Sequence, residues 1–525
     1  MPVTTSRRQL LQTAVVGGPA LLAGAPVRAA AKGDPQPLRP NSIPVADLPG
    51  YFDVEPGFHN LENGYWSIMP RVVADAFATH NSDVNRTNAI WARNVLPGGV
   101  GAAAALQAAS AAIARQVGCA PDEIAVTRSG ADALQMLIVN YRGLKAGDAV
   151  IHCDLDYDAM IAAMGWLGTH RGAKVVRFAM PEPATTANIL AAYEAVLKAN
   201  PNAKLLLVTQ VSNRTGLVTP VKEIVAMARA RGVDTIVDAA HGIACLDFQP
   251  DDLGADFVGW SVHKWTSAPL GTGAMYIRRS RLADIDIAYG HHGLGADNIN
   301  ARAPSGTVNF AALLTIPTAV DFHFAVGAAA KEKHLRGLRD RWVNAVRDLP
   351  NVEICVPDDP ARYCAITSFR LKGMTTPALA QRVQKRLFEA HRIHTVWRAG
   401  VEKGPVIRVT PGLYTTRADV DALAAGLRAE QAMLLGARAC IPKVGEGPPA
   451  VRKPMPAFDP LRTFSARSGS EPQRRGQLVH PREYPRYGLV LRTVTQMLIG
   501  TTLDQSPQGH QRAANQTRGK GHPQT

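Results

Sequence analysis

The stretch IVDAAHG at residues 236–242, followed by GWSVHKW at residues 259–265, decides the fold of this chain of 525 residues. The first stretch belongs to an apolar run that ends in Asp238. A second short run, Phe257–Gly259, leads into Ser-x-His-Lys and so to Lys264. Open α/β sheets bind ligands beyond the carboxyl ends of their strands. We therefore expect Asp238 and Lys264 at that edge of a sheet.

Short apolar runs alternate with helical patterns between residues 100 and 280. Such alternation is typical of an α/β layer structure with a mostly parallel sheet. The expected strands are Glu123–Thr127, Ala149–Cys153, Lys174–Phe178, Lys204–Thr209 and Thr235–Asp238, and the expected helices include Ala131–Asn140, Ile189–Ala199 and Pro220–Arg231. From about residue 350 the pattern predicts a smaller α+β domain, with strands at Ala365–Arg370, His394–Val396 and Val406–Val409 and a last helix from about Arg417 to Leu435.

The pairing of Asp238 with Lys264 has a clear chemical use. An aspartate can keep a pyridine nitrogen protonated, and a lysine can form a Schiff base with an aldehyde. In this order and at this spacing the residues resemble the class V aminotransferase superfamily, whose members have PLP fold type I and use pyridoxal 5′-phosphate (PLP). The resemblance extends over roughly residues 60–435. It implies PLP as cofactor, with Lys264 and Asp238 as the catalytic residues.

Other motifs of the family follow in the same order. TRSGADA at residues 127–133 lies at a strand-to-helix turn, where backbone amides favour an anionic phosphate. The phosphate cup of the family maps onto Gly130 and Ala131. Many relatives have Thr-Thr-Glu where this chain has Gly-Ala-Asp, so one hydroxyl contact is missing. The other implied cofactor contacts are Tyr157 stacked on the ring, Asn213 and His241 at the phenolic oxygen, and Ser261, His263 and Thr307 at the phosphate.

Three further segments concern the substrate and the assembly. VIRVTPGLYTT at residues 406–416 resembles the small-domain signature, which implies that Arg408 pairs with the substrate α-carboxylate through its planar guanidinium. LENG at residues 61–64 resembles the entrance segment and implies a contact from Asn63. GTVN at residues 306–309 resembles a segment that reaches the neighbouring subunit, which implies a homodimer. The six cysteines form no CxxC pair, so we expect no metal site.

Composition divides the chain into five expected segments. They are an export signal at 1–31, a Pro-rich N-terminal arm at 32–59, a large PLP-binding domain at 60–310, a small C-terminal domain at 311–440 and a basic, disordered tail at 441–525. The tail holds 13 Lys or Arg and 5 Asp or Glu, which accounts for eight of the net +15 charges. Such a tail is more often a solvated segment than a nucleic-acid arm, so we expect no nucleic-acid partner.

The N-terminus carries the pattern of an export signal. SRRQLL at residues 6–11 precedes an apolar run at 13–25 and the small residues that end VRAAA at 27–31. The run is too short to span a bilayer, so we expect no membrane insertion. The paired arginines resemble the twin-arginine type. This predicts a periplasmic or secreted bacterial enzyme, or a cytoplasmic one if the signal does not function.

Residues near Arg408 limit the set of reactions that the enzyme can be expected to catalyse. Relatives include cysteine desulfurases, transaminases, lyases, kynureninases and isopenicillin N epimerase-like proteins. Residues 391–400 contain no cysteine and Cys364 lies too far back, which disfavours desulfuration through a persulfide. Tyr157, the VDAAHG form and the stretch around Trp397 are most similar to the epimerase-like branch. We therefore expect an epimerase or racemase that acts at the Cα of a small, amino-acid-like substrate.

Lys264 would move the Cα proton in that reaction. The sequence does not identify a second proton donor. A transaminase or lyase stays open as an alternative, and so does a non-catalytic binder on the same fold.

Overall fold

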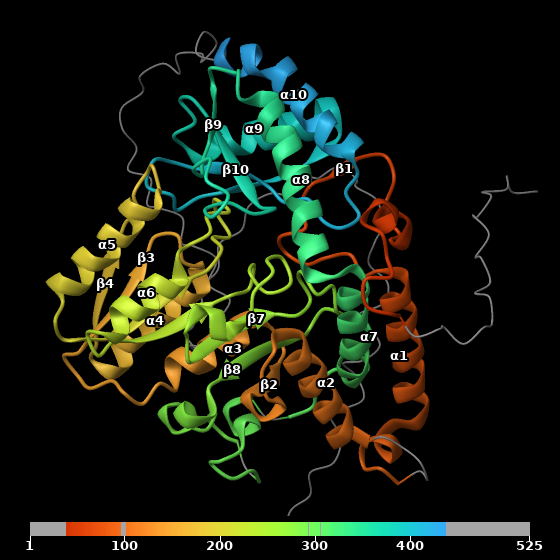
Figure 1. Cartoon of the computed structure of the whole chain (residues 1–525), viewed down its shortest axis with the longest axis vertical. Coiled ribbons are helices and arrows are strands. Elements are labelled where there is room, and N and C mark those ends of the chain that lie inside the picture. Colours follow the sequence, from red (N-terminus) through yellow and green to blue (C-terminus); the bar gives the residue numbers. More distant parts are fainter. Residues whose placement is uncertain (1–37, 96–100, 292, 305, 437–525) are drawn as a thin grey trace, which may run out of the picture. The chain divides into compact units, whose positions relative to one another are not determined.

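The computed structural model describes residues 38–95, 101–291, 293–304 and 306–436 (Figure 1). All of them belong to one compact unit of the chain. The expected export signal at 1–31 and the expected tail at 441–525 lie outside the described residues.

A seven-stranded sheet forms the centre of the large domain, in the order β2-β8-β7-β6-β5-β3-β4. The strands are β2 (Ile124–Thr127), β3 (Ala149–Cys153), β4 (Lys174–Phe178), β5 (Ala203–Thr209), β6 (Asp234–Asp238), β7 (Phe257–Ser261) and β8 (Gly273–Ile277). Neighbouring strands are parallel except where β8 is one of the pair. The sheet confirms the expected α/β class. The sequence analysis missed β8, because a five-residue apolar run does not reveal its direction or partners.

Different helices cover the two faces of this sheet. Along β5, Leu206 and Val208 enter one hydrophobic cluster while Leu205 and Leu207 enter the other, since successive side chains of a strand point to opposite faces. Burial on both faces explains why the inner strands read as continuous apolar runs, whereas the edge strand β4 is largely exposed. The first cluster includes residues from α1 (Arg71–Ala92), α2 (Gly101–Val117), α5 (Thr186–Ala199), α6 (Val221–Arg229) and α7 (Phe310–Val326), and the second from α3 (Gly130–Val139) and α4 (Asp158–Arg171).

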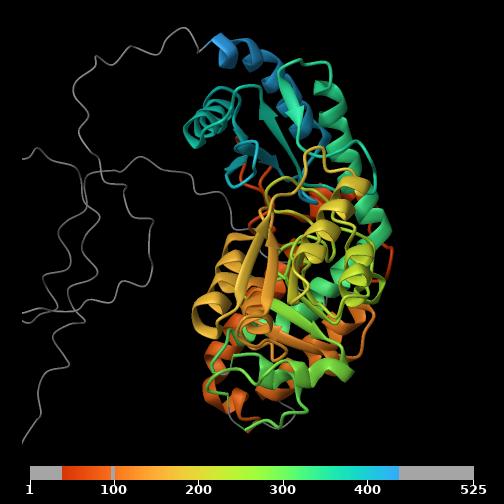
Figure 2. The ribbon, with the colours of Figure 1, turned by 90° about the vertical axis from the view of Figure 1, so that its left-hand side faces the viewer.

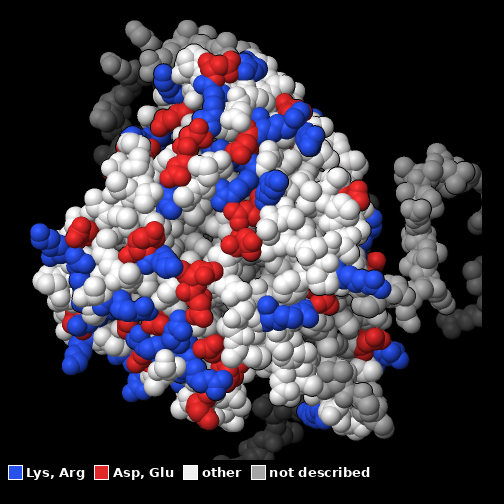
Figure 3. Space-filling view, in the orientation of Figure 1, with Lys and Arg blue, Asp and Glu red and all other residues white. Residues whose placement is uncertain are grey.

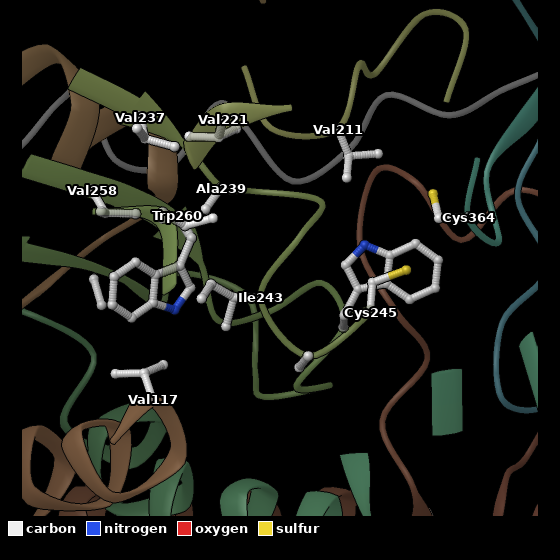
Figure 4. Close-up of a cluster of buried hydrophobic side chains, with 14 of the residues drawn as sticks. Val117, Val211, Val221, Val237, Ala239, Ile243, Cys245, Val258, Trp260 and Cys364 are labelled. Atoms are coloured by element: carbon white, nitrogen blue, oxygen red, sulfur yellow. The ribbon is translucent and has the colours of Figure 1, made fainter. Parts of the chain in front are cut away.

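The first cluster reaches the carboxyl edge of the sheet. Figure 4 shows the Trp260 indole of β7 with Val117, Val237, Ala239 and Ile243 around it. Trp260 is completely buried. It therefore fixes the end of β7 immediately before Ser-x-His-Lys begins.

The small domain contains an antiparallel sheet in the order β12-β13-β10-β9. Its strands are β9 (Val352–Ile354), β10 (Thr367–Leu371), β12 (Val396–Arg398) and β13 (Val406–Val409). Three helices, α8 (Ala328–Val346), α9 (Pro377–His391) and α10 (Arg417–Gly436), pack with it around a third hydrophobic cluster (Figure 1, Figure 2). The expected strand Ala365–Arg370 begins two residues later than predicted, so Cys364 precedes it.

The N-terminal part of the chain connects the two domains twice. Phe52 and Val73 belong to the first cluster of the large domain, whereas Leu61 between them belongs to the cluster of the small domain. Next to Leu61, β1 (His59–Asn60) pairs in parallel with β11 (Ile393–His394). The segment that carries Glu62 and Asn63 is thereby held against the small domain.

The expected segment limits stay predictions, and α7 begins at one of them. α7 contributes to the first cluster of the large domain, and α8 follows it after a bend of 74°.

No single helix among the described residues is long and apolar enough to cross a membrane, and only this bent pair passes such a test jointly. On the face in Figure 3 basic and acidic side chains are interspersed, in keeping with a nearly balanced body.

Candidate active site

Asp238 ends β6 at the carboxyl edge of the large sheet. Its register partners are Thr209 of β5 and Gly259 of β7. One carboxylate oxygen accepts a hydrogen bond of 2.9 Å from the Ala240 amide. Burial raises the pKa of Asp238, while that amide and the nearby Lys264 act in the opposite direction. A buried acid with one oxygen so held can present the other to a protonated ring nitrogen.

Lys264 lies three residues beyond β7, with its Nζ 3.1 Å from Nε2 of His241. Burial lowers the pKa of Lys264 to about 8, opposed by Asp238 and reinforced by Arg408 and Arg398. Loss of water around an ammonium group disfavours the charged form. A substantial fraction of the amine is therefore neutral near physiological pH, as a nucleophile towards an aldehyde must be.

The hydrogen bonds of His241 define its tautomer. The Trp265 indole donates to Nδ1 over 3.3 Å. Burial, and next to it the charge of Lys264, holds the pKa of His241 well below its usual range, so the ring is neutral. An indole N–H can only donate, so Nδ1 accepts and Nε2 carries the proton. His241 thus presents a donor beside Lys264, which suits a phenolate oxygen. No pattern in the sequence indicates this role of Trp265.

The turn before α3 brings Gly130 close to Ser261. The Gly130 amide donates to the Ser261 hydroxyl over 3.1 Å. A Cβ on Gly130 would lie 2.7 Å from that hydroxyl and from the carbonyl carbon of Trp260. The turn therefore requires glycine here. Ser129 caps the helix by accepting from the Asp132 amide, which places Ala131 in the first turn, where N–H groups attract anions.

His263, the other expected phosphate ligand on this side, is buried and shares a 2.8 Å hydrogen bond between Nδ1 and the Thr272 carbonyl. Nδ1 must therefore carry a proton. Burial, helped by the charge of Lys264, lowers the pKa of His263 to about 4. As a neutral ring it offers an acceptor at Nε2, so a bond to phosphate needs the protonated form, which a phosphate dianion would favour.

Arg408 and Asn213 meet where the small domain faces the loop after β5. Arg408 is 1% exposed, and its guanidinium donates to the Asn213 carbonyl over 2.8 Å and to the Glu62 carboxylate over 2.5 Å. Burial lowers the pKa of Arg408 to about 10, opposed by Glu62. Gly64 packs on the same guanidinium so closely that a Cβ would lie 2.4 Å from it. The sequence analysis did not foresee Glu62, although it adjoins the expected contact Asn63.

Three further site residues were expected from the sequence. Tyr157 is the N-cap residue of α4, without a cap hydrogen bond from its side chain, and is 41% exposed. Asn63 is buried, with its carboxamide oxygen against Gly412. Thr307 is exposed, and its neighbours Gly306 and Val308 line a cavity of about 350 Å³ beside the turn that precedes α3. The roles of all three stay predictions.

Asp156 is a further buried acid that the sequence analysis passed over. Its oxygens accept 2.7 Å hydrogen bonds from the Thr209 hydroxyl and from the Cys153 amide. Burial raises the pKa of Asp156 to about 7, and the charge of Asp238 adds to the rise. Asp156 follows the end of β3 by three residues and directly precedes Tyr157. An acid just after a buried strand, as Asp238 is at the end of β6, is the sequence pattern that could have identified it.

These residues fit PLP. The acid Asp238 at the sheet edge matches the ring nitrogen of PLP, and the amine of Lys264 matches its aldehyde. The donor on His241 matches the phenolate oxygen. The turn at Gly130, at the start of α3, matches the phosphate. Among the described residues the Asn213 carboxamide oxygen is buried without a hydrogen-bond partner, which leaves this side chain available to a ligand. No group of metal-binding side chains occurs within the described part of the chain.

The sequence model of the Aminotransferase class-V family matches residues 67–423, well over half of the chain, and the chain belongs to this family. The isopenicillin N epimerase of Streptomyces clavuligerus is 29% identical over 343 residues, covering 62% of this chain and 84% of that protein. The corresponding protein of Amycolatopsis lactamdurans is 25% identical over 391 residues, 71% and 96% of the two chains. A probable cysteine desulfurase of Vibrio cholerae is 25% identical over 389 residues, 70% and 92%.

Solved structures show the same fold. A cysteine desulfurase of Escherichia coli superposes with a TM-score of 0.62 at 19% identity, covering 75% of this chain and 100% of the other. The cystine C–S lyase C-DES, solved with glycine linked to its PLP, has a TM-score of 0.60 at 20% identity, over 73% and 98% of the chains. The predicted family and PLP fold type I are confirmed, and PLP is the cofactor of this class of enzyme.

Proposed function

We propose that this chain is a PLP-dependent epimerase or racemase that inverts the Cα of an amino acid or a related amine. The observation that carries the proposal is the amine of Lys264, of lowered pKa and 3.1 Å from a neutral His241. It is a base placed to move a proton. Similarity to two isopenicillin N epimerases supports the choice of reaction.

Different residues of the site hold the cofactor, move the proton and orient the substrate. Asp238, Lys264, His241 and the Gly130 turn would hold PLP at its ring nitrogen, aldehyde, phenolate and phosphate. When bound, PLP stabilises negative charge at the Cα of an attached amino acid. Lys264 would take the Cα proton from one face. Inversion then needs a proton returned to the opposite face, either by a second acid or by a Lys264 side chain that moves across. The buried Asp238 carboxylate would keep the ring nitrogen charged, and Arg408 would help to orient the substrate carboxylate.

Persulfide chemistry is disfavoured by the cysteines. Residues 391–408 contain none. Cys364 is completely buried, and its thiol lies 3.8 Å and 3.9 Å from the backbone oxygens of Gly216 and Ile366. A sulfur acceptor must reach the substrate and then solvent, which a thiol packed among backbone carbonyls does not do.

Proton NMR in heavy water tests the reaction. The full chain, loaded with PLP, is incubated with a panel of L-amino acids. The proposal expects loss of the Cα proton signal and appearance of the D-isomer without an oxo acid. Exchange accompanied by an oxo acid indicates a transaminase, and a cleaved side chain indicates a lyase; either result replaces the proposal.

Two further statements rest on the sequence. We propose a homodimer, because the exposed Thr307 segment resembles one that completes the neighbouring site; sedimentation of the purified enzyme at a monomer mass would contradict it. We also propose export through the twin-arginine route, and replacing Arg7 and Arg8 by lysine should retain the enzyme in the cytoplasm of its host.

A further inference from the structure

The register of the small sheet places a second arginine beside Arg408. Strands β12 and β13 are antiparallel, with Val396 opposite Arg408 and Arg398 opposite Val406. Side chains directly opposite one another lie on the same face, as do residues two apart along a strand. Arg398 and Arg408 are therefore diagonal neighbours on one face. Their Cβ atoms in such a pair are about 7 Å apart.

This arginine face points towards the large domain. Val406, which shares the face, packs in the first cluster of the large domain. Ile407 and Trp397 alternate onto the other face and pack in the cluster of the small domain. Both guanidinium groups therefore lie on the side of the active site. In agreement, the charge of Arg398 contributes to the lowered pKa values of Lys264, His241 and Arg408.

The two arginines differ in their counter-charges. Arg408 is paired with Glu62 at 2.5 Å, so its charge is already balanced. Arg398 has no ion pair or hydrogen bond from its guanidinium to any described residue, and its Nε is buried. A buried guanidinium nitrogen without a partner is costly in a folded protein. The acid that would balance Arg398 is missing from the described part of the site.

The chain after Arg398 is firmly held. The Arg214 guanidinium donates to the Ala399 carbonyl and, over 2.5 Å, to the Asp158 carboxylate. Gly400 packs on that guanidinium with φ of 85°, where a Cβ would collide with it. The end of β12 is thus fixed on a large-domain side chain, so the backbone next to Arg398 is held in place before any ligand binds.

We propose that Arg398 is the residue that receives the substrate carboxylate, together with the free edge of Arg408. Arg408 alone offers a guanidinium that Glu62 has neutralised. Arg398 supplies the uncompensated charge, and one carboxylate balances it. The substrate is therefore an amine whose carboxylate is unmodified and ionised, not an ester or an amide. This inference rests on the proposed function only in taking an amino acid as the ligand.

Acetate serves as the probe in the PLP-loaded full chain. The pKa of the Lys264–cofactor linkage is followed by visible absorption during a pH titration, at several acetate concentrations and constant ionic strength set with chloride. A carboxylate bound beside Arg398 offsets its charge, so the native enzyme should show a saturable rise in this pKa. Arg398→Gln should weaken acetate binding by about tenfold or more, the effect of losing one charge-assisted hydrogen bond. Arg398→Lys should retain part of it.

Three controls make the result specific. Glu62→Gln frees Arg408 and should tighten acetate binding. Arg382→Gln, an exposed arginine on α9, should change nothing. Methylamine, which lacks a carboxylate, should react with the cofactor equally in the native enzyme and in Arg398→Gln, which excludes general damage to the site.

No saturable response in the native enzyme, or an unchanged response in Arg398→Gln, overturns the inference. A normal acetate response in an enzyme that fails to epimerise any amino acid would instead reject the reaction and leave the inference standing.

Discussion

Trp265 and Lys264 are neighbours in the sequence, and both contact the same imidazole, the indole at Nδ1 and the amine at Nε2 of His241. The ring is thereby fixed between a donor-only group and the reactive amine.

Replacement of Lys264 by alanine should remove the covalent link to the cofactor and lower Cα exchange by at least about a hundredfold, the size of a lost general base. Absorption spectroscopy checks the first effect and deuterium exchange at Cα the second. Lys331→Met serves as the comparison, since Lys331 is also buried but bonds to the Trp265 carbonyl. Exchange at the native rate in Lys264→Ala would reject the assignment of the base.

Trp265→Phe should release the tautomer of His241. Without the indole N–H, Nδ1 can carry the proton, while burial and the charge of Lys264 still keep the ring neutral. Nε2 would then offer no donor to the phenolate oxygen, so the pKa of the Lys264–cofactor linkage should rise. NMR of the histidine ring nitrogens checks the tautomer, and the pH profile of cofactor absorption measures the pKa. Phenylalanine keeps an aromatic ring in the buried position, and unfolding by urea shows how much stability is lost separately.

Gly130→Ala should reduce cofactor binding. The new Cβ would lie 2.7 Å from the Ser261 hydroxyl and the Trp260 carbonyl carbon, which forces the turn apart and costs about 1–3 kcal/mol of stability. Gly165→Ala is the matched control, because no atom lies within 4 Å of a Cβ there and the residue is inside helix α4; it should stabilise by up to about 1 kcal/mol. Equal PLP affinity in both variants would contradict the close packing of the turn.

The stability of the cofactor-free protein should rise with pH between about 8 and the ordinary lysine value of 10.5. In that window the unfolded chain binds a proton at Lys264 that the folded chain does not, so raising the pH removes the advantage of the unfolded state. Lys264→Met should be less dependent on pH there and more stable below it. Lys331, whose pKa burial lowers to about 7, contributes with the same sign. Urea unfolding at successive pH values compares the variants, and identical slopes in Lys264→Met and the native chain would contradict the shift.

The sequence predicted those parts of the site that lie at strand ends. Asp238 and Lys264 follow apolar runs, and such runs mark buried strands whatever the order of the strands in the sheet. The roles of Gly130, Asn213 and Arg408 came from the family resemblance, and the structure brings Asn213 and Arg408 into contact. Residue spacing alone would not have joined a loop of one domain to a strand of another.

The missed residues depend on register and tertiary contact. Arg398 faces the site because Val396 lies opposite Arg408, and a shift of one residue would turn it away. Glu62 meets Arg408 only because β1 pairs with β11, more than 330 residues further along the chain. Neither contact can be recognised from a short stretch of sequence. A buried strand that ends in an acid can be recognised in this way.

The double crossing of the N-terminal segment also governs how the small domain can move. Leu61 is embedded in that domain while Phe52 and Val73 are embedded in the other. We expect any rotation of the small domain to carry Glu62 along with Arg408, leaving their ion pair unbroken. The backbone must then bend in the two short stretches on either side of Leu61. One of these stretches carries the exposed Tyr65 and Trp66. These aromatic rings would then change position at the entrance to the site whenever the small domain rotates.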